Sequence, residues 1–377
     1  MSEWKIYKLG DIATFQTGKL NSNAAVSNGQ YPFFTCSPIT LSIDTWAFDK
    51  EAIILAGNNA EGNFSIKYYK GKFNAYQRTY IIEAMQGVCD TKFLYYSLKI
   101  FLKHFKRLSQ GTSTKFLTAV ILRSIEISLP PLAEQKRIAD ILSAIDDKIE
   151  LNHRINANLE QQAQALFDEI MSCELEYDLI ANIPHVIETG KRPKGGVASI
   201  TSGIPSIGAE NIKGLGYYDY SKTKYITEEF ATTLKKGFVN GYELLIYKDG
   251  GKPGYFIPNF SIFGNGFPYN KMALNEHVFL LDFRNKGYNF FAYFYFQQEK
   301  IMRYLNAQGS KAAIPGINRN DIENISIPTI QNKVIQDFCR QTENIITHIL
   351  NNASESRKLS IVRDALLPKL ISGKIKI

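Results

Sequence analysis

Several polar segments of this 377-residue sequence carry the residue types that bind nucleic acid. Lys and Arg neutralise phosphates, and Arg, Lys, Asn, Gln, Ser and Thr can also hydrogen-bond to base edges. The segments 110–115 and 308–311 stand at matching places in the two halves and are predicted to be loops, in which the glycine of Gln110-Gly111 or Gln308-Gly309 lets backbone N–H groups approach a phosphate closely. Candidate contacts in the first half are Lys19, Asn21, Asn23, Asn58, Asn59, Arg78, Gln110, Thr112, Ser113 and Lys115; in the second half they are Lys191, Arg192, Lys194, Lys248, Lys252, Gln308, Ser310 and Lys311.

Some of these residues have simpler interpretations. Asn58 and Asn59 could form a turn, and Arg78 could make an ion pair at the edge of a core. The aromatic run from Phe290 to Phe296 favours a buried core over a platform on which bases stack.

The sequence contains no recognisable catalytic motif. Gly250-Gly251-Lys252-Pro253 lacks the spacing and the hydroxyl of a phosphate-binding loop, and no G-x-S-x-G segment is present. The Asn/Asp-Pro-Pro-aromatic signature of amino-methyltransferases is also missing. The five histidines and four cysteines are scattered without metal-ligand spacing, so no metal is expected. We therefore expect a binding and scaffolding chain, not an enzyme.

Composition predicts more than one folded domain. Hydrophobic residues make up 45% of the chain, which is more than a single core usually organises at this length. The longest apolar run is far shorter than the ~20 residues that cross a bilayer, and no secretory signal is visible at the start. We expect a cytoplasmic protein with no membrane partner. The net charge is +8, and residues 1–132 carry +6 of it, which fits a nucleic-acid partner without requiring one.

An internal repeat organises the whole chain. Phe93-Leu-Tyr-Tyr96 matches Phe291-Ala-Tyr-Phe294 at an offset of 198, and Ile127-Ser-Leu-Pro130 matches Ile325-Ser-Ile-Pro328 at the same offset. Near the start of each half, Thr17-Gly-Lys19 is similar to Thr189-Gly-Lys191. The chain is therefore expected to hold two copies of one unit, related by a pseudo-twofold arrangement.

Each copy is predicted to begin with an α/β (α+β) globule, at 1–132 and 173–329. Short β-type runs occur at 52–55, 79–82, 243–246 and 277–281, and helices are predicted near 92–107 and 289–305. A long helix follows each globule, within 133–172 and 330–377, after a proline break.

Heptad spacing predicts that the two long helices form an antiparallel coiled coil. The first seam runs from Ile138 to Ile170 in alternating steps of four and three, and the second runs from Phe338 to Leu359 before it slips toward Val362 and Leu366. Both seams turn polar near their middles. Antiparallel pairing would bring Asn152, Asn156, Asn352 and Ser356 into one polar layer. The alternative is an exposed helix with Asn in these places by accident.

The segment Ile127-Ser-Leu-Pro-Pro-Leu-Ala-Glu-Gln-Lys-Arg-Ile-Ala-Asp-Ile-Leu142 resembles the specificity (S) subunits of type I restriction–modification systems. The opening Trp4-x-x-x-x-Leu9-Gly-Asp-Ile12 and the closing Leu366-Leu-Pro-Lys-Leu-Ile-Ser-Gly373 are similar to the same family. The second copy departs from it, with Pro328-Thr329 in place of Pro-Pro and Gln331-Asn332 in place of Glu-Gln.

The resemblance implies a DNA-recognition subunit. Each globule would be a target recognition domain that reads one half of a bipartite site in double-stranded DNA, and the coiled coil would set the spacer. Modification (methyltransferase) subunits, two in number, would dock on the helices, and restriction (translocase-nuclease) subunits would then join. S-adenosylmethionine, ATP and Mg²⁺ would be bound by those partners, and this chain would hold no cofactor. The alternative is a specificity-like interaction scaffold that has lost sequence-specific DNA reading.

Overall fold

The computed structural model describes residues 4–109, 114–250, 254–311 and 315–377, and its contacts divide the chain into two units. The first unit comprises residues up to 147 together with 359–377, and the second comprises 148–358. Each long helix contributes one part to each unit. The units therefore cut across the four segments expected from the sequence, whose boundaries stay a prediction.

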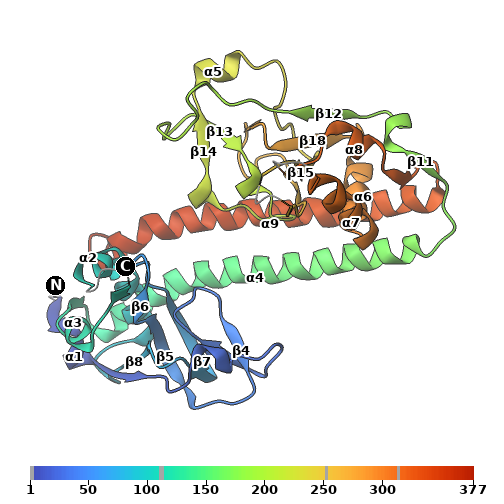
Figure 1. The fold of residues 1–377 in the computed structure, drawn as a ribbon. Helices are drawn as coiled ribbons and strands as arrows, with labels where there is room; N and C mark the ends of the chain where they lie inside the picture. Colours follow the sequence, from blue (N-terminus) through green and yellow to red (C-terminus); the bar gives the residue numbers. More distant parts are fainter. Residues whose placement is uncertain (1–3, 110–113, 251–253, 312–314) are drawn as a thin grey trace. The chain divides into compact units, whose positions relative to one another are not determined.

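A six-stranded sheet forms the body of the first unit, in the order β2-β8-β5-β7-β3-β4 (Figure 1). Only the β3–β7 pairing within it is parallel. A two-stranded pair, β6 with β9, lies outside this sheet. The bounds are β2 Ala13–Thr17, β3 Tyr31–Phe34, β4 Leu41–Ile43, β5 Phe48–Ala56, β6 Asn58–Asn59, β7 Ile66–Ala75, β8 Thr79–Ala84 and β9 Lys115–Phe116, with a 3-10 turn, η1, at Ser22–Ala24.

The core of the first unit lies between this sheet and helix α2 (Thr91–Leu108). Asp90 begins the helix, since its carboxylate accepts a hydrogen bond of 2.9 Å from the N–H of Phe93. A second antiparallel pair, β1 (Lys5–Lys8) with β10 (Glu126–Leu129), joins the start of the chain to the strand before the first long helix. Two short helices, α1 (Leu9–Ile12) and α3 (Ala119–Arg123), flank it. Helix α2 confirms the helix predicted near 92–107.

The second unit has two sheets, in the orders β12-β18-β15-β16 and β14-β13-β17, and a β11–β19 pair. The strand bounds are β11 Tyr177–Leu179, β12 Val186–Thr189, β13 Ile204–Ile207, β14 Lys224–Ile226, β15 Leu244–Tyr247, β16 Phe260–Ile262, β17 Ala273–Leu274, β18 Val278–Asp282 and β19 Ser326–Pro328. Helices α5 (Glu228–Thr232) and α8 (Arg319–Glu323) and the 3-10 turns η2 (Ile180–Asn182), η3 (Ala209–Asn211) and η4 (Tyr220–Lys222) complete it.

The single helix predicted near 289–305 is wrong, because the segment forms two helices. Helix α6 spans Lys286–Phe296 and α7 spans Glu299–Gly309, with the break at Gln297 and Gln298. The chain turns there so that the aromatic face of α6 stays buried while α7 presents a different face to the core.

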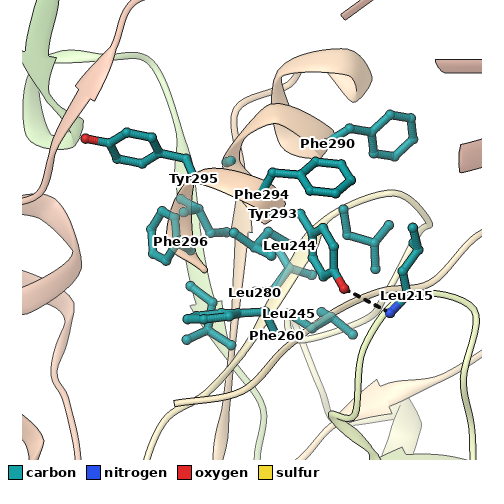
Figure 2. Close-up of a cluster of buried hydrophobic side chains, with 14 of the residues drawn as sticks. Leu215, Leu244, Leu245, Phe260, Leu280, Phe290, Tyr293, Phe294, Tyr295 and Phe296 are labelled. Carbon is teal, nitrogen blue, oxygen red and sulfur yellow. Dashed lines mark hydrogen bonds between the residues drawn. The ribbon is translucent and has the colours of Figure 1, made fainter. Parts of the chain in front are cut away.

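The aromatic run of α6 lies in the core, as predicted. Every residue from Phe290 to Phe296 is at most 2% exposed. Phe296 packs edge to face on Phe260 of β16 (Figure 2), whereas Phe294 contacts Phe167 and Phe338 of the long helices. The phenol oxygen of Tyr293 accepts a hydrogen bond of 3.1 Å from the N–H of Leu215. Burying each ring contributes about 1.5–3 kcal/mol.

The two units repeat one topology. The order β2-β8-β5-β7 of the first unit recurs as β12-β18-β15-β16 in the second, and β4-β3 recurs as β14-β13. The pair β1–β10 likewise recurs as β11–β19. Thr118 and Asn318 cap the equivalent helices α3 and α8 with their side chains. The repeat that the sequence predicts is therefore a structural repeat.

Helices α4 (Leu132–Met171) and α9 (Lys333–Ile371) run through both units and pair antiparallel within each. In the second unit Asn152 of α4 contacts Ser356 of α9, whereas Phe167 contacts Phe338, so numbers rise along one helix as they fall along the other. Every residue of the predicted first seam is buried or half-buried.

The end of the second seam differs from the prediction. Val362 is 47% exposed, and Arg363 points inward instead, where its Nη1 lies 2.6 Å from Asp146 Oδ1. The hydroxyl of Tyr96 also donates to Asp146, over 2.8 Å. Asp146 lies inside the first unit because Arg363 and Tyr96 supply the partners that a half-buried carboxylate needs.

Candidate nucleic-acid interface

Four chain segments meet at one end of the six-stranded sheet of the first unit. The N–H of Gly57, after β5, donates to the carbonyl of Arg78 over 2.8 Å, and the carbonyl of Gly57 accepts from Leu117 over 2.9 Å. The N–H of Gln77 donates to the carbonyl of Leu20 over 2.9 Å. The structure thus brings together the candidate segments around Lys19, Asn58 and Arg78, which are far apart in the sequence.

Glycines make this approach possible. A Cβ atom on Gly57 would lie 2.5 Å from the carbonyl oxygen of Arg78, and one on Gly18 would lie 2.0 Å from the carbonyl oxygen of Ala75. Both distances are shorter than van der Waals contact, so only glycine fits at these two positions.

A hollow of about 290 Å³ opens between these segments. The exposed guanidinium of Arg78 lies over the ring of Phe116, 5.6 Å from its centroid, and that ring is 37% exposed. Burial raises the pKa of Tyr80, and its neutral hydroxyl donates to the carbonyl of Leu117 over 2.9 Å. The lining residues are Thr17, Gly57, Gln77, Arg78, Tyr80, Phe116 and Leu117.

The other candidates of the first unit lie around this hollow in different roles. Lys19, Asn21 and Asn23 are exposed, and the Asn21 side chain accepts a hydrogen bond of 3.0 Å from the Gln77 amide. Asn59 forms a turn, because its side-chain oxygen accepts from two backbone N–H groups at 2.9 Å each. Asn58 lies in β6 opposite Phe116, and its side-chain oxygen is buried without a partner among the described residues.

The predicted loop at 110–115 is described only at its end. Lys115 is half-buried in strand β9, paired with Asn59, and so is not in a loop. Gln110, Thr112 and Ser113 lie outside the described residues.

The second unit closes the equivalent end of its sheet with the same backbone hydrogen bonds. The N–H of Lys248, after β15, donates to the carbonyl of His277 over 2.9 Å, and the carbonyl of Lys248 accepts from Ile317 over 2.8 Å. A Cβ atom on Gly190 would lie 1.6 Å from the carbonyl oxygen of Leu274, which matches the position of Gly18. His277 therefore stands where Arg78 stands in the first unit.

Charge at this end differs between the units, because the second unit pairs its cations with carboxylates. Lys248 and His277 both contact Asp249, and Arg192 Nε lies 2.7 Å from a carboxylate oxygen of Glu276. Burial alone would raise the pKa of Asp249, but hydrogen bonds from Lys248 and His277 outweigh burial and hold that pKa below its ordinary value. Lys191 and Lys194 are exposed, whereas Lys252 lies outside the described residues.

The predicted loop at Gln308 to Lys311 is wrong, since Gln308 and Gly309 form the last turn of α7. The helix continues because Gly309 is buried against Phe256, where a Cβ atom would lie 2.3 Å from the ring. Ser310 is the residue that ends the helix, and Lys311 Nζ donates to the Gln308 side chain over 2.7 Å.

The polar residues of the two helix seams form one hydrogen-bonded layer within the second unit. The amide of Asn152 donates to Ser356 Oγ at 3.2 Å and to Glu355 Oε2 at 2.8 Å. The amide of Asn352 donates to Asn156 Oδ1 over 2.9 Å. Asn152 is fully buried, so this layer fixes one relative register of α4 and α9.

Sequence reasoning missed five residues at the two sheet ends: Gln77, Phe116, Asp249, Glu276 and His277. Four of them flank strands, and Phe116 is itself the last residue of β9. An alignment of the two copies around strands 79–84, 244–247 and 278–282 would have identified the other four, because they flank these strands. Phe116 has no aromatic counterpart, because Gly316 takes its place opposite Asp249.

The described parts of the chain contain neither a candidate metal site nor a candidate membrane-spanning helix. No group of three or more His, Cys, Asp or Glu side chains is placed to hold a metal ion among those residues. No described helix is both long and apolar enough to cross a membrane.

Comparison with known proteins identifies relatives over the whole chain. The profile of the type I restriction modification DNA specificity domain matches residues 1–161. The EcoDI specificity subunit of Escherichia coli is 42% identical over 164 residues, which are 44% of this chain and only 35% of that subunit. The HindI specificity subunit of Haemophilus influenzae is 22% identical over the full length of both chains.

A solved structure has the same fold. The S subunit of a type I restriction-modification system from M. genitalium matches with a TM-score of 0.65 at 17% identity, over 98% of this chain and 96% of that one. At this identity the match concerns the fold alone. The repeated topology, the paired helices and the alignments from end to end agree: the chain is similar over its whole length to specificity subunits of type I restriction–modification systems, and residues 1–161 match their DNA specificity domain.

Proposed function

We propose that this chain is the DNA sequence-specificity subunit of a type I restriction–modification complex. Each unit reads one half of a bipartite target through the end of its sheet, and the helix pair sets the spacer between the halves. The observation that carries the proposal is the repeat. Two copies of one topology close the same sheet end with the same backbone hydrogen bonds but present different side chains there. Such a pair suits two half-sites of different sequence.

Catalysis belongs to partner subunits in this proposal. Two modification subunits dock on α4 and α9 and use S-adenosylmethionine, and restriction subunits that use ATP and Mg²⁺ then join. This chain supplies recognition and assembly and holds no cofactor of its own. Cellular DNA is the substrate, so the complex acts in the cytoplasm.

Methylome sequencing of host cells with and without the gene tests the proposal. We expect a bipartite methylated motif that disappears when the gene is deleted and returns when it is restored. Identical methylomes in a host whose modification subunit is active would contradict the proposal and favour an interaction scaffold without DNA reading.

Binding of the purified chain gives a second test. We expect specific duplex binding mainly in the assembly with the modification subunit, because residues 1–132 and 173–329 carry only +6 and +2. That charge is small beside the two negative charges per base pair of a duplex. Tight specific binding by the isolated chain at physiological salt would show that the partner is not needed for reading.

A further inference from the structure

We propose that the hollow of the first unit reads a guanine base through Arg78, with Phe116 holding the guanidinium in place, and that the second unit has no equivalent guanine reader. This inference rests on the proposed function and deepens it, because it assigns one base class to one half-site. It follows from four features of the sheet ends.

The guanidinium of Arg78 is available to a ligand. Among the described residues no carboxylate lies within ion-pair distance of it, although Arg192 and Lys248 of the second unit both have such partners. Arg78 is exposed, its side chain makes no hydrogen bond or ion pair with the described residues, and its guanidinium lies over the ring of Phe116. Arginine carries donors and no acceptor, and it stays charged at any working pH.

The ring of Phe116 limits the orientations that Arg78 can take. A guanidinium over an aromatic face keeps its N–H groups in one plane, with their edge free to make hydrogen bonds. Less side-chain freedom is then lost on binding than for a fully mobile arginine. Phe116 is therefore a positioning residue for Arg78.

Of the other polar side chains that line the hollow, those of Tyr80 and Gln77 already have partners, and that of Thr17 carries no charge. The hydroxyl of Tyr80 donates to the Leu117 carbonyl, and the Gln77 amide donates to Asn21. Gly57 has no side chain, so position 57 adds no further polar group to the hollow. Arg78 is thus the cation with unused donors in this hollow, and two parallel donors match the O6 and N7 acceptors of guanine in the major groove.

The second unit offers different chemistry at the same backbone positions. The hydrogen bonds that equate Arg78 with His277 also place Glu276 at the position of Gln77. The strand bridge opposite Asp249 is made by Gly316, so no ring stands in the place of Phe116, and the nearby cation Lys248 lies over Phe279 and is paired with Asp249. A half-site read at this position by the second unit is not read by an arginine, and the two half-sites differ.

The test uses the full chain assembled with its modification subunits, and duplexes in which each position of the methylated motif is changed in turn. We compare the wild type with Arg78→Lys, Arg78→Ala and Phe116→Leu. The matched control is Arg123→Lys, since Arg123 is also exposed and lies 5.7 Å from the centroid of Phe15, but outside the hollow.

We expect one G·C pair in one half-site at which the wild type discriminates by roughly 5- to 150-fold, as a bidentate arginine contact does. Arg78→Lys should abolish that discrimination but keep the salt dependence of binding. Lysine retains the positive charge, whereas the two parallel N–H donors of the guanidinium are lost. Phe116→Leu should weaken the same discrimination in part. The control should leave every position unchanged, and intact reading of the other half-site shows that the variants fold and assemble.

Three outcomes overturn the inference. If Arg78→Lys keeps full discrimination at every position, or if Arg78→Ala lowers affinity equally for all sequences, Arg78 contacts at most a phosphate, and the proposed function still stands. If the wild-type assembly binds all duplexes equally, both the inference and the proposed function fail.

Discussion

Gly18 and Gly190 occupy the same backbone position in the two units, and each packs against a carbonyl oxygen of a neighbouring segment. They begin the segments that carry Lys19 and Lys191. A side chain at either position would push that segment away from the sheet end, so these glycines place the candidate DNA contacts without touching DNA.

Replacing Gly18 by Ala should lower the free energy of unfolding of the first unit by about 3 kcal/mol, the upper end for a methyl forced into packed structure. Gly87→Ala is the control. Gly87 has a positive φ of 78° but nothing within 4 Å of its Cβ position, so about 1–2 kcal/mol is expected. Urea denaturation followed by circular dichroism measures both. Equal losses would show that crowding at Gly18 is relieved by a small backbone shift.

Lys115 and Lys311 belong to the candidate phosphate contacts. Lys115→Ala or Lys311→Ala should weaken DNA binding of the assembled complex for all sequences and reduce the slope of log affinity against log salt by about one unit each. Lys70→Ala is a suitable control, since Lys70 is an exposed lysine in β7 that belongs to no candidate segment. If salt titrations give the same slope for the wild type and all three variants, neither Lys115 nor Lys311 contacts a phosphate.

At the residue scale, the sequence predicts which segments are polar but not which side chains contact one another, because the partners come from distant segments. Residue type and glycine spacing pointed to the segments at Lys19, Asn58 and Arg78. These segments lie around one hollow because of the strand order of the sheet, which is built from segments far apart in the sequence. Asp249 and His277 come into contact only because two strand ends meet, and nothing in their local sequence indicates this contact. Lys311 binding back to Gln308 likewise follows from a helix that continues further than expected.

At the scale of elements, the polar layer between α4 and α9 has two buried members, Asn152 and Ser356. The two N–H groups of the Asn152 amide lie within hydrogen-bond distance of Glu355, Ser356 and the carbonyl of Asn352. The bond to Asn152, followed by that to Lys148, holds the pKa of Glu355 below its ordinary value, so its carboxylate is charged and accepts at neutral pH. The layer that fixes the register of α4 and α9 thus includes a hydrogen bond to a charged carboxylate.

Replacing Asn152 by Ala should lower the free energy of unfolding of the second unit by about 1–3 kcal/mol, because buried hydrogen bonds are lost and a cavity forms. Asn158→Ala provides the comparison, since Asn158 is an exposed residue of the same helix and should change stability by no more than about 0.5 kcal/mol. Guanidinium denaturation measures the difference. Similar values for the two variants would mean that the layer adds nothing to stability.

Helical periodicity predicted these elements well, and it failed where a tertiary partner changes the pattern. The heptad spacing located both long helices to within a few residues, since one apolar face is visible in the sequence. It did not foresee that Arg363 would turn inward to Asp146, because a buried ion pair looks like two surface charges in a sequence. The break between α6 and α7 was missed for a similar reason, as neither glycine nor proline marks it.

At the scale of the whole molecule, the repeat separates what is constant from what differs. Strand order, closing hydrogen bonds and helix caps are shared, whereas the side chains at the two sheet ends are not. If each unit reads its own half-site, exchanging residues 1–132 for the matching block of another specificity subunit should change one half of the motif and leave the other. Methylation mapping of the chimera decides this. Loss of both halves in a protein that still assembles would show that the units do not read independently.

The spacer between the half-sites should follow the length of the helices. Helix α4 has 40 residues, or about 60 Å at 1.5 Å per residue. Insertions are best placed at the unit boundaries, between 147 and 148 in α4 and between 358 and 359 in α9. The ion pair of Asp146 with Arg363 and the layer around Asn152 are then kept intact on either side.

Four residues inserted at both places would lengthen the helix pair by about 6 Å and rotate the remainder of each helix by roughly 40°. This is close to two base-pair steps of about 3.4 Å. Duplex DNA also rotates with each added pair, so the recognised spacer should grow by about one or two base pairs. A full heptad keeps the seam in register but adds about 10 Å, so it should change the spacer more or abolish binding. The methylated motif in cells carrying each variant is the measurement. An unchanged spacer in an active, assembled complex would mean that the docked partner subunits, and not these helices, set the distance.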